Sequence, residues 1–330
     1  MTGAAVAKPG ASLSGEGRDR LLAILGQFER LVVSDDMGGA FFRMLLAQNP
    51  DVEIISAGRI NETSYPLRFD EFILKAGIMG ARAVVTVGGD GIASYTATAI
   101  IRQAGRFASP MGILGFPAGT ANVGPIVRQD SCEDSLGKSA KLDSIEVTCA
   151  GKVLGYGFND VILGRTFLGT SGGRWVNLDA AAMAGKGQAV ESAMEEGAVT
   201  SEDFAVLLNG KKADARFDLP VKQICISTLH QDNLYGRAIS GALVEASGFS
   251  HPAAVALLDK ISNDARPETW GEKGFRTTAQ MCFDAGDAVE IRGLDDGVCV
   301  IIDGNPFILQ ENRITVRCVP DSVKVFGIGG

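Results

Sequence analysis

Residues 84–94 read Val-Val-Thr-Val-Gly-Gly-Asp-Gly-Ile-Ala-Ser, and this stretch decides the fold. The β-branched run Val84–Val87 is typical of a strand that is buried on both faces. A tight glycine turn, Gly88–Gly91, follows it, and residues 92–102 then have the apolar spacing of a helix that begins at once. The combination predicts a backbone anion site, because unpaired N–H groups and the positive end of the helix dipole face the same point.

Asp90 is the only side chain of this turn that can accept a proton, and Gly88, Gly89 and Gly91 surround it. A carboxylate beside a phosphate cradle is electrostatically costly unless it has a chemical role or a cation partner. Three interpretations stay open. Asp90 acts as the general base for an acceptor hydroxyl, or it holds a Mg²⁺ that bridges nucleotide phosphates, or it only accepts backbone N–H bonds that stiffen the turn.

The chain around this turn alternates short aliphatic runs with helical patterns from residue 18 to residue 143. The expected strands are 30–34, 52–56, 84–87 and 112–116, and the expected helices are 37–47, 69–80 and 92–102. This alternation predicts an α/β domain with a mainly parallel sheet. Ligands of such sheets bind beyond the carboxyl ends of the strands, so the glycine turn and the loop 117–122 are expected to share one site.

After about residue 143 the pattern changes to short strand candidates separated by turns. They are 145–148, 154–158, 205–208, 223–227, 288–292, 298–302 and 314–318. Asp303-Gly304 separates two of them and is a common hairpin signal. Residues 144–330 are therefore expected to form an all-β domain, decorated by the small-residue segment 178–197 and a helix over 252–262. Residues 1–17, rich in Ala, Gly and Ser, are expected to be a flexible tail.

The composition narrows the class of protein. A chain of 330 residues favours two domains. A net charge of −8 and a pI near 5.0 argue against nucleic acid or an anionic membrane as the main partner. The sequence has neither an apolar run long enough to span a bilayer nor the apolar core of a signal peptide, so we expect a cytoplasmic protein.

Cysteine and histidine usage disfavours two further kinds of site. The six cysteines are scattered, with no Cys-x-x-Cys pair, at positions 132, 149, 225, 282, 299 and 318. We expect reduced cysteines that act as small buried hydrophobes, and no zinc site. The chain has two histidines, His230 and His251, which gives little support to a Ser-His-Asp hydrolase.

Two other polar segments are candidates for ligand binding. Thr120 and Asn122 stand beside the flexible Gly119, where they either bond phosphate or ribose hydroxyls or close the loop on itself. Asn159 and Asp160 interrupt an apolar run, and adjacent polar residues are costly to bury unless they are satisfied. They form either a bulge or turn, or a site in which Asp160 accepts two ribose hydroxyl protons and Asn159 bonds a base or amide.

Three motifs in order carry a family resemblance. The Gly-Gly-Asp-Gly turn resembles that of the NAD kinase / diacylglycerol kinase superfamily. Residues 113–122, Ile-Leu-Gly-Phe-Pro-Ala-Gly-Thr-Ala-Asn, are similar to the second phosphate-side loop of that superfamily. Residues 157–169, Gly-Phe-Asn-Asp-Val-Ile-Leu-Gly-Arg-Thr-Phe-Leu-Gly, contain a pair similar to its acceptor motif, and their continuation resembles the acetoin catabolism protein X branch.

The resemblance implies a fold and an activity. The fold is an α/β nucleotide-binding domain with a mainly parallel sheet, over residues 18–143, followed by a β-sandwich that binds the substrate, over residues 144–330. The activity is phosphoryl transfer from ATP, or from polyphosphate, with Mg²⁺. Asp90 would be the catalytic base, the glycine turn and Gly119–Asn122 would bind the donor phosphates, and Asn159 and Asp160 would bind the acceptor. No metal ligand is identified.

The sequence departs from the family pattern at two places. Ile92 stands where NAD kinases usually have a threonine after the glycine turn. Residues 227–237, Ser-Thr-Leu-His-Gln-Asp-Asn-Leu-Tyr-Gly-Arg, lack the family's acceptor-loop pattern. Ile301–Gly304, by contrast, resembles the C-terminal hairpin of NAD and diacylglycerol kinases.

Three functions follow in order of preference. The first is a kinase of the NAD kinase-like type that phosphorylates a hydroxyl of NAD or of a related nucleoside or small metabolite. The second is a non-catalytic nucleotide-binding protein linked to acetoin-type catabolism, which Ile92 and the altered 227–237 loop favour. The third is a lipid kinase-like enzyme, which the acidic balance disfavours. We expect a homo-oligomer with a nucleotide or other small molecule as its partner.

Overall fold

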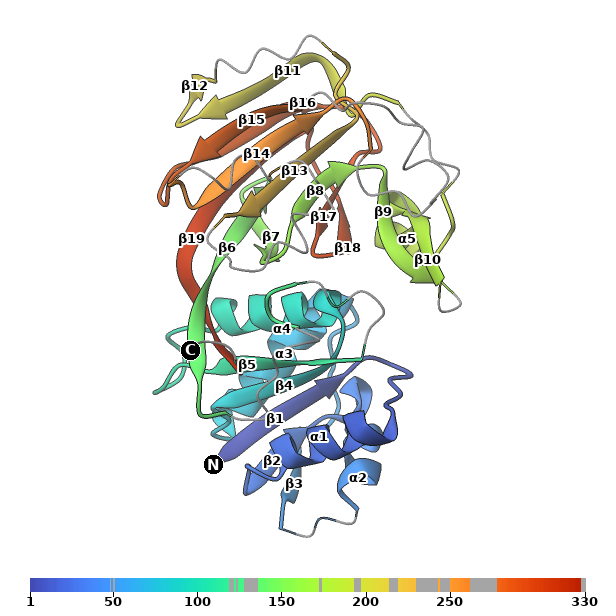
Figure 1. The fold of residues 1–330 in the computed structure, drawn as a ribbon, viewed down its shortest axis with the longest axis vertical. Helices are drawn as coiled ribbons and strands as arrows, with labels where there is room; N and C mark the ends of the chain where they lie inside the picture. The colour runs from blue at the N-terminus through green and yellow to red at the C-terminus, as the bar shows by residue number, and fades with distance from the viewer. Residues whose placement is uncertain are drawn as a thin grey trace. The chain divides into compact units, whose positions relative to one another are not determined.

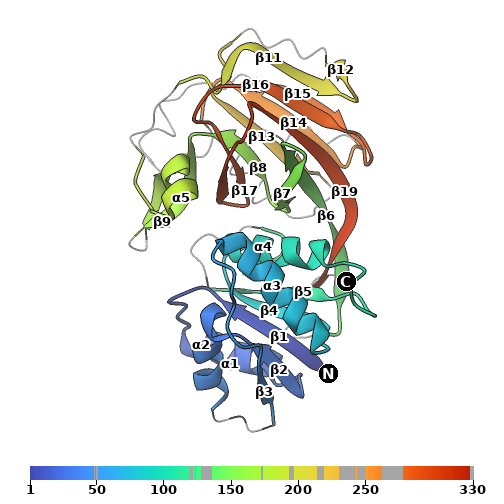
Figure 2. The same ribbon diagram turned by 180° about the vertical axis from the view of Figure 1, so that it is seen from behind.

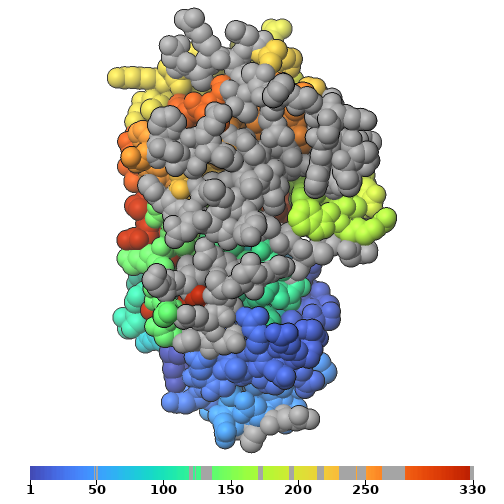
Figure 3. All heavy atoms as spheres, viewed as in Figure 1, coloured from blue at the N-terminus to red at the C-terminus, as the bar shows by residue number. Residues whose placement is uncertain are grey.

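The computed structural model describes residues 1–47, 49, 51–118, 122, 124–127, 136–171, 174–192, 197–213, 219–229, 243, 250–261 and 278–327. Figure 1 shows the ribbon, Figure 2 shows it from behind, and Figure 3 shows all heavy atoms with the other residues in grey. The chain divides into two compact units. The first contains residues 1–142 and 321–330, and the second contains residues 143–320.

The first unit is an α/β structure. Its strands are β1 (Thr2–Ala7), β2 (Arg30–Val33), β3 (Glu53–Ser56), β4 (Ala83–Gly88), β5 (Gly112–Pro117) and the last part of β19 (Arg313–Phe326). Its helices are α1 (Gly15–Leu25), α2 (Gly39–Leu46), α3 (Tyr65–Ile78) and α4 (Asp90–Arg102), with a 3₁₀ turn at Asp35–Met37. The strands pair in the order β3-β2-β1-β4-β5-β19, and every pair is parallel. The expected parallel sheet is therefore confirmed.

Helices cover both faces of this sheet, α1 and α2 on one and α3 and α4 on the other (Figures 1 and 2). The face under α1 and α2 is a continuous apolar core in which Phe28, Phe42 and Phe116 are the large side chains. All six residues of β1 and of β4 are buried. Burial on both faces explains why residues 84–87 read as an uninterrupted apolar run.

Residues 1–17 do not form the expected flexible tail. Residues 2–7 are the strand β1, which pairs with β2 on one side and with β4 on the other. The helix α1 begins after Ser14, whose hydroxyl accepts the N–H of Gly17 at 3.1 Å. The sequence Thr-Gly-Ala-Ala-Val-Ala hides this strand because it has few β-branched residues. Small residues are needed here, since a Cβ at Gly3 would lie 2.4 Å from the ring of Phe28.

The second unit is rich in antiparallel strands, as expected. Its strands besides β19 are β6 (Ser139–Cys149), β7 (Lys152–Gly157), β8 (Val161–Gly164), β9 (Thr166–Ser171), β10 (Arg174–Asp179), β11 (Thr200–Leu208), β12 (Lys211–Lys212), β13 (Gln223–Thr228), β14 (Ala253–Leu258), β15 (Thr278–Phe283), β16 (Val289–Leu294), β17 (Cys299–Ile302) and β18 (Asn305–Ile308). The helix α5 (Ala180–Lys186) lies within the small-residue segment 178–197 and follows the hairpin β9–β10. β6 and β19 both run on into the first unit.

Two layers of strands enclose the core of the second unit. One layer has the order β15-β14-β13-β8-β17-β18, and the other contains β12-β11-β16-β19 with β6 and β7. One apolar cluster takes alternate residues from both layers, for example Ile226 and Val300 from the first and Ile291 and Val316 from the second. The opposite face of the first layer is covered by a second cluster that includes Phe167 and Leu178 from β9 and β10.

The prediction of a helix over residues 252–262 is wrong. Residues 253–258 are β14, which pairs with β13 and β15 and is buried along its whole length. Its sequence, Ala-Ala-Val-Ala-Leu-Leu, has no polar alternation because both faces of the strand are covered, and alanine and leucine favour helix when the rest of the fold is ignored. No described helix is long and apolar enough to cross a membrane.

Candidate functional site

The strand order of the first unit reverses between β1 and β4. From β1 the chain adds β2 and β3 on one side, and then β4 and β5 on the other. In open parallel sheets the loops at such a reversal diverge beyond the carboxyl ends of the strands, and ligands bind there. The two loops at this point are residues 8–14, which follow β1, and the glycine turn, which follows β4. The glycine turn therefore lies where a parallel sheet most often binds a ligand.

Gly88 closes the end of β4 against the first turn of α4. A Cβ at this position would lie 2.6 Å from Cγ2 of Ile92 and 3.4 Å from Cβ of Lys8. The carbonyl of Gly88 accepts the N–H of Ala118 at 2.9 Å, which holds the start of the loop after β5 beside the turn. Ile92, the residue that departs from the family pattern, is buried and packs against Gly88.

Asp90 is the first residue of α4, after the extended Gly89, and is half-buried. Its Oδ1 accepts the backbone N–H of Gly124 at 3.0 Å. This hydrogen bond and that from Ala118 to Gly88 tie the glycine turn to the segment after β5, so the two segments lie at the same edge of the sheet. The first of these bonds also shows that Asp90 stiffens this edge, whichever further role it has. Gly91 lies within the first turn of the helix.

Asn122 is buried, with 8% of its surface exposed, and has a φ of 38°. This left-handed conformation is rare for residues other than glycine and is tolerated by asparagine. Gly119 and Thr120, which were expected to bind phosphate with it, lie outside the described residues, and so do residues 230–237 of the expected acceptor loop.

Lys8 is a candidate that the sequence analysis missed. Its N–H donates to the carbonyl of Val87 at 2.9 Å, so it stands at the carboxyl end of β1, directly beside the glycine turn. Its side chain is exposed. The sequence does contain a lysine followed by Pro9 and Gly10, but its place beside the glycine turn depends on β1, a strand that the sequence pattern does not predict.

Asn159 and Asp160 lie in the second unit, in the turn between β7 and β8. Asp160 is buried, with 8% of its surface exposed, whereas Asn159 is half-buried. The carboxylate of Asp303 accepts backbone N–H bonds from this turn, and the hydroxyl of Ser227 donates to the carbonyl of Asn159 at 2.6 Å. Asn159 and Asp160, which interrupt the apolar run, therefore form a turn that is held by hydrogen bonds to its backbone.

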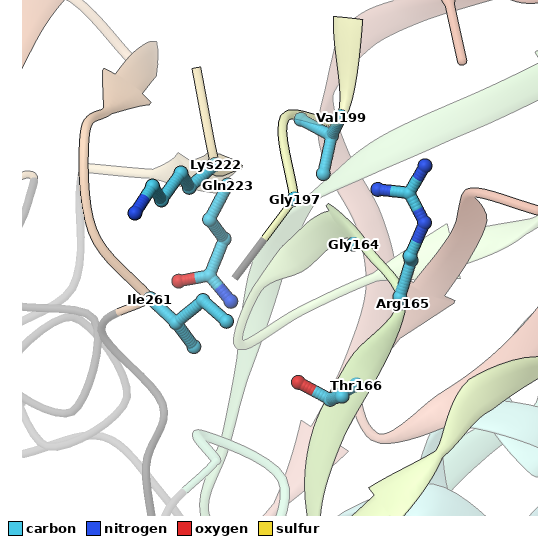
Figure 4. A pocket seen from close by; sticks show the side chains of 8 residues that line it. All are labelled: Gly164, Arg165, Thr166, Gly197, Val199, Lys222, Gln223 and Ile261. Carbon is cyan, nitrogen blue, oxygen red and sulfur yellow. The ribbon is translucent and has the colours of Figure 1, made fainter. Parts of the chain in front are cut away.

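A small polar hollow elsewhere in the second unit is lined by Gly164, Arg165, Thr166, Gly197, Val199, Lys222, Gln223 and Ile261 (Figure 4). The guanidinium of Arg165 donates to the carbonyl of Ala198 at 2.7 Å and pairs with Asp295. Because its charge already joins two loops, Arg165 has a structural role here. None of the predicted site residues lines this hollow.

The described cysteines behave as the sequence predicts. Cys149, Cys225, Cys299 and Cys318 are free and buried, and Cys282 is free and half-buried. Burial raises the pKa of Cys299 to about 11 and that of Cys318 to about 12, so both thiols are protonated at neutral pH. In the described part of the chain no three His, Cys, Asp or Glu side chains form a group that could hold a metal ion.

Comparison with known proteins gives a structural match only. No protein-family model matches the sequence, and a search of curated proteins finds no match. Among solved structures, that of yeast NADH kinase in complex with NADH matches over 99% of this chain and 82% of the yeast chain, at 11% sequence identity and a TM-score of 0.50. At this identity the match shows the fold and not the activity. The chain therefore has the NAD kinase fold, a parallel α/β region followed by an antiparallel β-rich region.

Proposed function

We propose that the protein is a kinase of the NAD kinase-like type, which transfers a phosphoryl group from ATP or polyphosphate to a hydroxyl of NAD or of a related nucleoside. One observation carries the proposal. The Gly-Gly-Asp-Gly turn stands at the carboxyl edge of the sheet, beside the strand pair at which the strand order reverses. A glycine turn that only stiffened the sheet would serve equally well at any other strand end.

The donor phosphates fit this edge. The N-terminus of α4 carries the positive end of the helix dipole, which favours an anion. Lys8 adds a positive charge on the adjacent strand end. Bound ATP with Mg²⁺ would supply the transferable phosphoryl group and neutralise its charge. Mg²⁺ is usually held by one or two carboxylates together with substrate phosphates, and Asp90 suits that arrangement without a cluster of protein ligands.

Asp90 is proposed as the catalytic residue. A carboxylate at the mouth of the anion site can accept the proton of the acceptor hydroxyl while the phosphoryl group is transferred. The hydrogen bond from Gly124 to Oδ1 fixes its orientation. Positioning matters more than basicity in phosphoryl transfer, since the transition state makes few covalent demands on the protein.

The acceptor is proposed to bind at Asn159 and Asp160. A ribose offers two adjacent hydroxyl donors, and a carboxylate can accept from both. The Asn159 amide can both donate and accept, which suits a base or amide of the acceptor. Both side chains belong to the same short turn between β7 and β8, so one acceptor can reach both of them.

A second function, nucleotide binding without transfer, is favoured by one observation. Ile92 places an apolar side chain against Gly88, at the position where the family pattern has a hydroxyl. A protein with this change keeps the anion site and loses one polar group from it. The experiment on Asp90 separates the two functions.

The substitution Asp90→Asn tests the proposal. It keeps the shape and removes the charge, so turnover of NAD with ATP is expected to fall by about 10²–10⁴-fold, the usual scale for a general base. Asp179→Asn is the matched control, because Asp179 also accepts a backbone N–H at a helix start, from Ala182 at 2.7 Å. The control should keep full turnover.

Thermal unfolding of both variants would show that the fold is intact. Equal turnover in the wild type and Asp90→Asn would remove Asp90 from catalysis. No turnover by the wild type, with ATP binding retained, would favour the binding protein.

A further inference from the structure

Asp303 directs its carboxylate into the turn between β7 and β8. Oδ1 accepts the N–H of Asn159 at 2.8 Å, of Asp160 at 3.1 Å and of Phe158 at 3.2 Å, and Oδ2 accepts the N–H of Phe158 at 2.9 Å. In return, the N–H of Asp303 donates to the carbonyl of Asp160 at 3.0 Å. Three consecutive backbone donors therefore point at one carboxylate 143 to 145 residues away in the sequence.

The hairpin that contains Asp303 does not by itself explain this arrangement. Asp303 and Gly304 have φ values of 47° and 78° and form the two-residue turn between β17 and β18. An Asp-Gly pair is a usual choice for such a turn, and Asn-Gly serves it equally well. The side chain of a hairpin turn ordinarily faces solvent, yet Asp303 is only 4% exposed. Its burial points to a second role.

That second role requires a carboxylate. The N–H groups of the turn need acceptors only, and an ionised aspartate presents acceptors on both oxygens. An asparagine would present one oxygen, and its NH₂ group would face a backbone N–H. The hydrogen bonds from these three N–H groups also compensate the burial of the Asp303 charge, which would otherwise be very costly. The β17–β18 hairpin accepts either Asp or Asn at position 303. The β7–β8 turn, whose N–H groups need acceptors only, requires Asp.

The turn is also held from its other side. The hydroxyl of Ser227, at the end of β13, donates to the carbonyl of Asn159 at 2.6 Å. With its N–H bound to Asp303 and its carbonyl bound to Ser227, Asn159 has both backbone polar groups fixed. Gly157 lets the chain enter the turn closely, since a Cβ there would lie 2.6 Å from Cγ2 of Val161.

We infer that Asp303 is a positioning residue for the acceptor site: it fixes the backbone from which the side chains of Asn159 and Asp160 reach the ribose of the acceptor. The inference rests on the proposed function, which gives those two side chains their role. Asp303 itself does not contact the acceptor. Because Asp303 already orders the turn, Asp160 loses less conformational entropy when the acceptor binds.

The test compares two ligands on the full-length protein by calorimetry. NAD probes the acceptor site, and inorganic tripolyphosphate probes the phosphate site. In Asp303→Asn the Kd of NAD should rise about tenfold or more, the scale of losing hydrogen bonds to a charged group, while the Kd of tripolyphosphate should change less than twofold. Amide hydrogen exchange of residues 158–160 should become at least about tenfold faster, because their shared acceptor is weakened.

Two further variants complete the design. Asp321→Asn is the matched control, because Asp321 also has a positive φ, of 52°, but is exposed and pairs with Lys141 at the surface. It should change neither ligand. Ser227→Ala removes the clamp on the other side of the turn and should raise the Kd of NAD about threefold to tenfold. It provides the test if Asp303→Asn does not fold.

The outcomes separate this inference from the proposed function. If the wild type binds tripolyphosphate but not NAD, the acceptor assignment fails and the inference with it. If the wild type binds NAD and Asp303→Asn binds it equally well despite faster amide exchange, only the inference is overturned. An unfolded Asp303→Asn together with unchanged NAD binding in Ser227→Ala also overturns it. Equal weakening of both ligands would make Asp303 a general structural residue, which contradicts the inference.

Discussion

The role of Lys8 can be inferred only from the residues that lie beside it in the sheet. In the sequence it is an isolated cation between Ala7 and Pro9. In the sheet its N–H bonds Val87, and its Cβ approaches Gly88. Lysine is a compact point charge on a flexible stem, which suits it to a phosphate that approaches the N-terminus of α4.

The substitution Lys8→Met tests this role. It keeps the length of the side chain and removes its charge, so the affinity for tripolyphosphate is expected to fall about tenfold at low salt, the scale of one charge-assisted hydrogen bond. The loss should shrink as salt is added, since the contact is exposed. Lys211→Met, at an exposed position in β12, is the control and should bind as the wild type does. Unchanged affinity in Lys8→Met would exclude the charge from the phosphate site.

The residues that the sequence predicted and those that it missed differ in one physical respect. Asp90, Asn159 and Asp160 were found because a polar group interrupts a local pattern. Lys8 and Asp303 were missed as candidates because each acts across a strand pairing, with partners about 80 and 145 positions away in the chain. A local window shows the residue itself but not the distant partner that gives it a role.

At the scale of elements, local rules succeeded where one face of an element is exposed or its turn chemistry is strong. The strands β2, β3, β4 and β5 and the helix α4 lie within a few residues of their expected bounds. The rules failed for β1 and β14, which are alanine-rich. Both are covered on two faces, so they lack the alternation that identifies a strand.

The junction between β4 and α4 yields a prediction about packing. Gly88→Ala places a methyl group against Cγ2 of Ile92, and such overpacking usually costs about 1–3 kcal/mol of unfolding free energy. In an Ile92→Leu background the cost should be smaller by about 1 kcal/mol, because leucine has no methyl group on Cβ. Urea unfolding of the four proteins measures this coupling.

Gly15→Ala is the control for the glycine substitution. A Cβ at Gly15 meets no atom within 4 Å, and Gly15 is the first residue of α1. Stability should therefore stay equal or rise by less than about 1 kcal/mol. Equal costs of Gly88→Ala in both backgrounds would show that Ile92 is not what excludes a side chain at this position.

At the scale of the whole molecule, the sequence predicted two regions of different class, and the structure has them. The alternation of strands and helices gave the first, and the succession of short strands gave the second. The composition of the two chain ends did not reveal that both belong to the first unit. Their assignment follows from the pairing of β1 with β4 and of β19 with β5.

The central place of β1 predicts the effect of removing it. Deletion of residues 2–7 leaves β2 and β4 with unpaired inner edges and exposes the core that Ala5 and Val6 help to close. We expect aggregated protein, or protein without a cooperative unfolding transition, by size exclusion and circular dichroism. Glu29→Gln removes only the exposed ion pair with the amino group of Met1 and should keep the wild-type Tm. A cooperatively folding deletion variant would contradict the sheet order.

The last strand has a consequence for how the chain is made. Residues 1–117 emerge from the ribosome first, and they contain five of the six strands of the first sheet. The sixth, residues 321–326, emerges only after the whole second unit has been synthesised. Until then Gly112 and Ile113, which pair with β19, are an unpaired edge that can pair with another nascent chain, whereas Gly115 further along β5 is already bridged to Val127. This edge of β5 therefore stays unpaired for the time that translation of residues 143–320 takes. During that interval a chaperone would protect β5.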